Sequence, residues 1–313
     1  MKLNEIISVL KDAEIILHAG DDINEPVELN TGNKREDVIF WCSEKYADKI
    51  VLLQAGTVIC SRETAGKKLN KKINYLMVSH PRLAFLKVME LFADKKNELG
   101  GNNRIAATVV IHPSVKIGSG CSIGHHVIIE EGCSIGSNVK IGHNTVVHRG
   151  TIIGNLVVIG CNNTIGGVGF GYEKEENGKY ILMPHLGNVV ISDFVEVGNN
   201  TCIDRAVLGS TIISEYVKID NLVHIAHGVF IGKNSLVIAN SMIGGSVRVG
   251  ENCWLAPSAS VINKGEIGDG AVVGMGAVVI KRVEVNQTVA GNPAQPTEVL
   301  KKINSFLRKQ SGI

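Results

Sequence analysis

The sequence is dominated by an apolar residue that returns at every sixth position. The repeat begins at Ile111, is interrupted between Ile165 and Ile191 and again after Ile203, and reaches Val279 with 25 in-phase positions. Fixed-period self-similarity is the mark of a solenoid. A period of six excludes both the α-helix, with a period of about 3.6, and the alternating strand, with a period of about two. The chain must therefore wind into stacked, nearly identical units.

We interpret each six-residue unit as one short strand plus a turn, with three units closing a triangular coil of 18 residues. The repeating apolar residue should point into the prism, and the small residue four positions later should fill the corner beside it. We expect about eight coils, with Ile117, Ile219 and Val249 inside. Because each coil covers only its neighbours, stability should build up by stacking.

Composition limits the classes of function. The 313 residues allow roughly two domains. A net charge of +2 gives no broad field for nucleic acid. No apolar run approaches the ~20 residues that span a membrane, and acids inside the first apolar stretch argue against a signal peptide. The seven cysteines form no CxxC pair and read as reduced. We expect a cytoplasmic protein with no membrane span and no nucleic-acid partner.

The repeat divides the chain into three parts. Residues 1–103 lack it and show apolar runs typical of a small α/β domain, including expected strands at 38–41 and 51–53. Residues 104–290 form the predicted β-helix, with an excursion loop at 166–188. Residues 291–313 contain a proline-bearing stop and a short amphipathic helix. The predicted fold class is therefore mainly β. An excursion of this length from a regular coil more often forms a functional site than a loop without a role, so we expect 166–188 to belong to a site.

One coil carries candidate chemistry. His224 and His227 flank Ile225, which points inward, so both imidazoles should lie near the outer surface. An imidazole with a pKa near ~6.5 is the natural general base at neutral pH. One coil of 18 residues beyond His227 is Gly245, which should stack about one strand spacing (~4.8 Å) from His227. Its N–H should be free to meet an oxyanion. This pair suits acyl transfer to an amine; the alternative is that His227 is only a surface turn residue.

The other histidines give no comparable pattern. His125, His126, His143 and His148 fall in or near turns. β-Helices of this kind can hold zinc through histidines of adjacent subunits, but no spacing among these stands out. We predict no metal site.

Three segments carry a family resemblance: NTIGGVGFGY, the stretch from MPHLGN to GSTII, and IDNLVHIAHGVFIG. They resemble the UDP-3-O-acylglucosamine N-acyltransferase family (LpxD), and the likeness covers nearly the whole chain. It implies a left-handed parallel β-helix, a homotrimer with sites at the interfaces, and no permanently bound cofactor. By this match His227 is the catalytic base and Gly245 the glycine whose amide faces the oxyanion, while Asn221 and His224 are neighbouring polar positions that contact substrate.

The segment VIFWCSEKYADKI resembles the uridine-binding stretch of the same family. The resemblance implies that Phe40 and Tyr46 sandwich uracil. From the residues alone, Phe40 reads as a core residue and Tyr46 as a half-exposed surface residue.

The C-terminal segments CWLAPSASV and VAGNPAQP read more like sugar acetyltransferases that use coenzyme A, and only one short helix follows them. We therefore expect N-acylation of a nucleotide-linked amino sugar, UDP or dTDP, in surface-glycan synthesis, with short-chain acyl-CoA as the co-substrate. The alternative is the lipid A enzyme with acyl carrier protein as donor. Two further alternatives belong to other classes: a metal enzyme like the carbonic anhydrases of this fold, and a non-catalytic binding solenoid.

Overall fold

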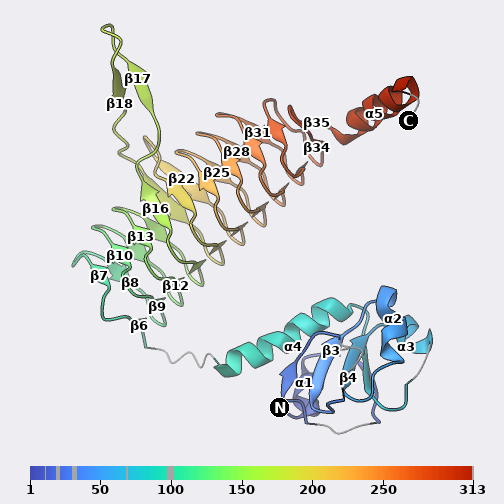
Figure 1. Ribbon diagram of the computed structural model, residues 1–313. Coiled ribbons are helices and arrows are strands. Elements are labelled where there is room, and N and C mark those ends of the chain that lie inside the picture. Colours follow the sequence, from blue (N-terminus) through green and yellow to red (C-terminus); the bar gives the residue numbers. More distant parts are fainter. Residues whose placement is uncertain (11, 19–21, 30–33, 68–69, 97–101, 312–313) are drawn as a thin grey trace. The chain divides into compact units, whose positions relative to one another are not determined.

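The computed structural model describes residues 1–10, 12–18, 22–29, 34–67, 70–96 and 102–311. The chain divides into two compact units, Met1–Leu99 and Gly100–Ile313 (Figure 1). None of the helices in these described ranges has the length and apolar character that crossing a bilayer requires.

The first unit is a five-stranded sheet with helices around it. The strand order is β1-β5-β4-β3-β2, and only β1 runs antiparallel to its neighbour. Apolar side chains alternate between two clusters, so that Phe40 packs in one and Ile39 in the other. The predicted strand at 51–53 is wrong, because these residues form the turn after a short helix. The elements are α1 (Leu3–Ser8), β1 (Glu14–Ile16), β2 (Glu25–Pro26), β3 (Val38–Trp41), the 3₁₀ helix η1 (Glu44–Tyr46), α2 (Ala47–Ile50), β4 (Thr57–Cys60), α3 (Arg62–Lys67), β5 (Asn74–Met77) and α4 (Pro81–Lys96).

The second unit is a parallel β-helix with three faces, as the repeat predicts. Strands one coil apart pair in register, for example Ile225 with Ile243. The first face has nine strands: β7 (Val110–Ile111), β10 (Ile128–Ile129), β13 (Val146–Val147), β16 (Thr164–Gly167), β21 (Cys202–Asp204), β24 (His224–Ile225), β27 (Met242–Ile243), β30 (Ser260–Val261) and β33 (Val278–Val279).

The second face has eight strands: β8 (Lys116–Ile117), β11 (Ser134–Ile135), β14 (Ile152–Ile153), β19 (Asn188–Ile191), β22 (Ser210–Ile213), β25 (Phe230–Ile231), β28 (Arg248–Val249) and β31 (Glu266–Ile267). The third has eleven: β6 (Arg104–Ile105), β9 (Ser122–Ile123), β12 (Lys140–Ile141), β15 (Val158–Ile159), β20 (Glu196–Val197), β23 (Lys218–Ile219), β26 (Leu236–Val237), β29 (Trp254–Leu255), β32 (Val272–Val273), β34 (Thr288–Ala290) and β35 (Gln295–Pro296). The helix α5 (Thr297–Ser311) follows.

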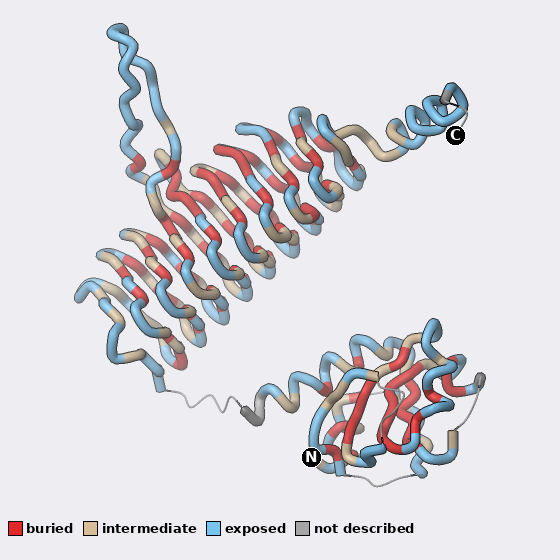
Figure 2. The backbone as a smooth tube through the Cα atoms, viewed as in Figure 1, coloured by how far each residue is buried: buried red, intermediate tan, exposed pale blue. Residues whose placement is uncertain are grey.

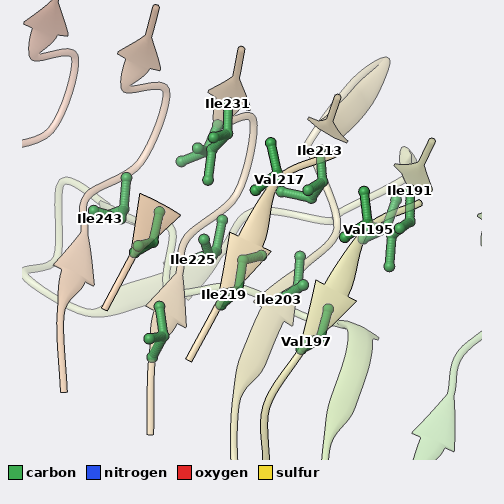
Figure 3. Close-up of a cluster of buried hydrophobic side chains, with 14 of the residues drawn as sticks. Ile191, Val195, Val197, Ile203, Ile213, Val217, Ile219, Ile225, Ile231 and Ile243 are labelled. Atoms are coloured by element: carbon green, nitrogen blue, oxygen red, sulfur yellow. The ribbon is translucent and has the colours of Figure 1, made fainter. Parts of the chain in front are cut away.

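The repeating apolar side chains fill the prism in stacked layers (Figure 3). Ile219 and Val249 are buried, and Ile117, near the first coil, packs partly buried against the same core. All seven cysteines are free thiols, and Cys121, Cys133 and Cys253 occupy buried corner positions. The turns between strands take left-handed backbone conformations, largely at asparagine and glycine, the residues that adopt them most readily.

Both interruptions of the repeat lie at the corner between the first and second faces, in neighbouring coils. The longer one leaves after β16 and forms a hairpin of β17 (Tyr172–Lys174) and β18 (Tyr180–Leu182). This hairpin projects away from the β-helix (Figure 1) and is exposed along most of its length (Figure 2). The shorter one joins β21 to β22. Only the two ends of the hairpin segment therefore return to the β-helix surface.

Candidate active site

The candidate base lies where β24 ends and the chain turns toward the next face. His224 is on the strand with its side chain outward, Ile225 is fully buried, and His227 follows in the turn, partly buried. The inward packing of Ile225 thus fixes both imidazoles on the outside of one coil, as the sequence predicts.

Gly245 lies directly over His227 in the next coil. An added Cβ on Gly245 would stand 2.8 Å from Nε2 and 2.9 Å from Cε1 of His227. Any larger residue at this position would therefore require the imidazole of His227 to shift. The stacking of these two residues was deduced from the 18-residue period, and the structure shows it.

The Gly245 N–H is not free, contrary to the sequence argument. It donates a hydrogen bond of 2.9 Å to Oδ1 of Asn263, one coil further on. The same ladder recurs elsewhere, as between the N–H of Glu251 and Oδ1 of Asp269 at 2.8 Å. Backbone donors in the turns take a side-chain oxygen from the next coil because the neighbouring strand does not reach them.

Asp204, at the end of β21, supplies a carboxylate beside the histidines. Its Oδ2 lies 3.7 Å from Nε2 of His224, and the residue is buried. Burial raises the pKa of Asp204, and the nearby His224 and His185 oppose that rise. No sequence motif marks Asp204 as a site residue, although it directly follows Ile203, where the second interruption of the repeat begins.

His185 comes from the returning end of the excursion, 42 residues before His227. Its ring meets that of His227 edge to face, with centroids 5.3 Å apart and planes at 83°. The backbone of Gly169, from the outgoing end, fits between them: an added Cβ there would lie 3.1 Å from His185 Nε2 and 3.2 Å from both Asp204 Oδ2 and His227 Cβ. The excursion is therefore part of the candidate site. Its length and the resemblance segment that begins MPHLGN are the sequence signals near His185.

The electrostatics of the site keep His227 neutral. Burial lowers the pKa of His227 below its ordinary value, and the neighbouring His185 and His224 lower it further. A neutral imidazole can accept a proton at physiological pH, which is the first requirement of a general base.

The remaining predicted site residues lie elsewhere. Asn221 precedes β24 whereas His227 follows it, so they occupy different corners of the coil; Oδ1 of Asn221 accepts from the backbone and side chain of Asn199 at 2.7 and 2.9 Å. In the first unit, Phe40 is 0% exposed within the core, so its ring has no free face for a base. Tyr46 is exposed, with the ammonium groups of Lys45 and Lys49 at 5.5 and 4.9 Å from its ring centre.

In the described part of the chain, no three histidine, cysteine or acidic side chains are grouped to hold a metal ion. His125 and His143 stack at 5.6 Å, but His125 Nδ1 pairs with the hydroxyl of Thr108 at 3.0 Å.

Solved structures show which class of protein shares this architecture. A UDP-N-acetylglucosamine acyltransferase from Campylobacter jejuni superposes with a TM-score of 0.56 at 19% identity, covering 62% of this chain and 73% of that chain. The UDP-N-acetylglucosamine acyltransferase from Francisella novicida superposes with a TM-score of 0.57 at 23% identity, covering 63% of this chain and 72% of that chain. At these identities the likeness concerns the fold, the left-handed β-helix of the hexapeptide acyltransferases.

Sequence relatives narrow the class. No family model matches the chain. A UDP-3-O-acylglucosamine N-acyltransferase from Campylobacter lari is 43% identical over 302 residues, which cover 94% of this chain and 93% of the relative. Another, from Helicobacter hepaticus, is 42% identical over 272 residues, which cover 85% of this chain and 83% of the relative. The chain belongs to the UDP-3-O-acylglucosamine N-acyltransferase family and is an acyltransferase.

These relatives correct the functional expectation drawn from the C-terminal segments. A surface-glycan enzyme with short-chain acyl-CoA is wrong as the main interpretation, and the lipid A alternative agrees with the names of the relatives. The match to the Campylobacter lari protein spans 93% of that protein, so features of this chain's C-terminal segments do not mark it as another class. Short motifs such as VAGNPAQP follow from ending a β-helix, and they carry little information about the acyl donor.

Proposed function

We propose that this chain transfers an acyl group from the phosphopantetheine thioester of acyl carrier protein to the amine of UDP-3-O-acylglucosamine, a step of lipid A assembly. One observation carries the proposal: a neutral imidazole, His227, is held against Gly245 in a chain 43% identical to a relative of that name. No cofactor is needed beyond the donor's own pantetheine arm.

In the proposed reaction, the sugar amine attacks the carbonyl carbon of the thioester. His227 takes the proton that the amine loses as the C–N bond forms. The tetrahedral intermediate then collapses, the C–S bond breaks, and the imidazolium returns that proton to the departing thiolate. The products are an amide and a free thiol, and His227 is again neutral.

The oxyanion of the intermediate needs a donor close to the base. The Gly245 N–H is the nearest backbone candidate, and it serves only when the Asn263 side-chain oxygen, now 2.9 Å away, gives way to the substrate. The same movement would turn the Asn263 amide nitrogen toward the intermediate. We include both groups in the proposed site.

The first unit is proposed to bind the uridine diphosphate. Tyr46 offers an exposed aromatic face, and Lys45 and Lys49 beside it suit a diphosphate. Phe40 would join Tyr46 as a stacking partner only if its core position opened, so Tyr46 is the stronger candidate. Assembly as a homotrimer, with sites between subunits, is proposed from the family resemblance.

The test is a direct assay. The purified chain is incubated with UDP-3-O-acylglucosamine and either 3-hydroxyacyl carrier protein or the matching coenzyme A thioester. The sugar product is then identified by its mass in a mass spectrometer. We expect N-acylated product, formed faster from the carrier protein and lost in His227→Ala. No product from either donor would refute the proposal, and faster turnover of the coenzyme A thioester would refute the proposed donor.

A further inference from the structure

The proposed reaction gives no role to a buried cation that lies beside the site. Arg205, directly after β21, is 4% exposed. Its Nε donates to the carbonyl oxygen of Gly166 at 2.6 Å, and its two Nη groups donate to no atom of the described residues. Among those residues only Nε2 of His185 is a fully buried side-chain nitrogen or oxygen without a hydrogen bond. The Nη groups of Arg205 are therefore not fully buried, and they remain open to a ligand.

Arg205 lines a pocket at the corner between the first and second faces of the β-helix. The pocket has a volume of about 470 Å³, within the ~300–1,000 Å³ of small-molecule sites. Its walls come from the turns after β10, β13 and β21 and from the start of β19. His227 lies at the same corner, after β24, which is the neighbour of β21. The wall formed by Arg205 therefore belongs to the coil next to that of the proposed base.

A second cation lines the same pocket. Arg149, in the turn after β13, is exposed, and its side chain has no hydrogen bond or ion pair among the described residues. Burial and the nearby Arg149 lower the pKa of Arg205, whereas Glu130 raises it. The Glu130 carboxylate is already engaged: Oε2 accepts the backbone N–H of Arg149 at 2.9 Å, and Oε1 lies 3.2 Å from Nδ1 of His148. The two guanidinium groups thus repel each other, and an anion in the pocket would be attracted by both.

We propose that this pocket binds a phosphate group through the buried Arg205 and the exposed Arg149. A guanidinium group suits phosphate because its planar N–H groups donate in pairs. The bond to Gly166 already orients Arg205, so its Nη groups lose little freedom when they bind. Glu131 is the carboxylate on the pocket wall, and it is exposed. Two arginines and one carboxylate give the lining a formal charge of +1, which favours an anion.

Two ligands of the proposed function carry phosphate: the sugar nucleotide has a diphosphate, and the pantetheine arm of the donor has one phosphate. The choice of phosphate over other anions rests on that function. The unpaired guanidinium groups and the pocket do not depend on it.

The test is titration calorimetry of the full chain with pyrophosphate, UDP and 4′-phosphopantetheine. The wild type is compared with Arg149→Gln, Glu131→Gln and the matched control Arg248→Gln, since Arg248 is also an exposed arginine, in β28 and outside the pocket. The ligand that occupies the pocket should bind about tenfold more weakly to Arg149→Gln, which loses a charge-assisted contact. It should bind about twofold more tightly to Glu131→Gln, because an exposed charge is partly screened. Arg248→Gln should bind as the wild type does.

The three probes distinguish the sources of the phosphate. Weaker binding of pyrophosphate and UDP to Arg149→Gln would assign the sugar nucleotide, and weaker binding of 4′-phosphopantetheine alone would assign the donor. Unchanged affinities for all three, or equal losses in Arg149→Gln and Arg248→Gln, would overturn the proposal. Affinities that fall only in Lys45→Gln/Lys49→Gln would place the phosphate on the first unit, which also overturns it.

Arg205 is tested by Arg205→Lys, which keeps the charge and removes the paired donors. We expect a loss similar to that of Arg149→Gln, and unchanged affinity in the folded variant would overturn the role of Arg205. A melting curve shows whether the variant is folded, and Arg149→Gln decides the proposal if it is not. Binding needs no turnover: probes held through Arg149 by a chain that transfers no acyl group would refute the proposed function and leave this site in place.

Discussion

The regular coils and the interrupted corner of the β-helix bury different kinds of polar groups. In the regular coils the buried polar side chains are neutral. Most are hydroxyls, such as Ser235, which donates to the Gly250 carbonyl at 2.8 Å, and Asn163 is an amide that donates to the Gly198 carbonyl at 2.8 Å. At the interrupted corner the buried groups are ionisable: His185, Asp204 and Arg205.

The difference shows how a repeat accommodates a site. A strict hexad places each side chain either in the apolar core, where desolvation disfavours a charged imidazole, or in solvent, where an imidazole keeps its ordinary pKa. The excursion adds a third environment by covering the outer surface beside β24. The repeat therefore stacks His227 under Gly245, and the excursion adds His185 and Gly169 around His227. Variants of the core and variants of this corner should affect different quantities.

The largest effect is expected from His227→Ala. It should lower kcat by ~10²–10⁴-fold, the usual contribution of a positioned general base, with little change in Tm because the side chain lies outside the prism. The pKa of His227 is lowered from 6.5, so its neutral form persists to lower pH. In the wild type, the loss of kcat on acidification should therefore occur below pH 6.5. Steady-state kinetics against pH and a melting curve check this. Near-normal kcat would mean that another group takes the proton.

Ile153→Ala should show the opposite pattern in a regular coil. Ile153 is buried in β14 and its neighbour Ile152 is exposed, so the same substitution at the two positions is a matched pair. Ile153→Ala should lower the unfolding free energy by ~2–5 kcal/mol because it leaves a cavity. Ile152→Ala should change the unfolding free energy by no more than about 0.5 kcal/mol. Denaturant titration measures both. Equal losses would disprove the assignment of inward and outward positions.

Gly245→Ala tests a residue that belongs to a regular coil and also contacts the candidate site. Its Cβ would stand 2.8 Å from His227 Nε2, so the ring must move. A misplacement of this size costs roughly 10²-fold in rate, while Tm should fall only slightly. The control is Gly66→Ala, whose Cβ meets nothing within 4 Å. An unaffected kcat in Gly245→Ala would show that the imidazole has other productive positions.

The smallest effect is expected from His224→Ala. This imidazole lies 3.7 Å from Asp204 and contacts substrate or the carboxylate without carrying the reaction's proton, so we expect less than a tenfold loss in kcat, below the range for a general base. Measuring kcat and KM separately distinguishes binding from catalysis. A loss equal to that of His227→Ala would exchange the roles of the two histidines.

Much of the fold could be predicted from the sequence because a hexad repeat admits one architecture. The inward positions, the stacking of His227 under Gly245 and the corner cysteines all follow from counting residues. Isolated apolar runs in the first unit were less informative: the run at 51–53 continues a helix into a turn, since three apolar residues fit either element. The prediction of a free Gly245 N–H is wrong because counting along one coil does not reveal the Asn263 oxygen of the next.

Counting along the repeat is enough to predict the prism, its register and the position of the proposed base, since each depends only on spacing along a regular chain. The approach of His185 to His227, and of Gly169 to Asp204 and His227, is visible only in the folded chain. Those contacts depend on the path of a 23-residue excursion (166–188) that has no period, and on two chain segments closing over the same buried point. Residues brought together in this way share no spacing rule, so their proximity is a property of the folded chain.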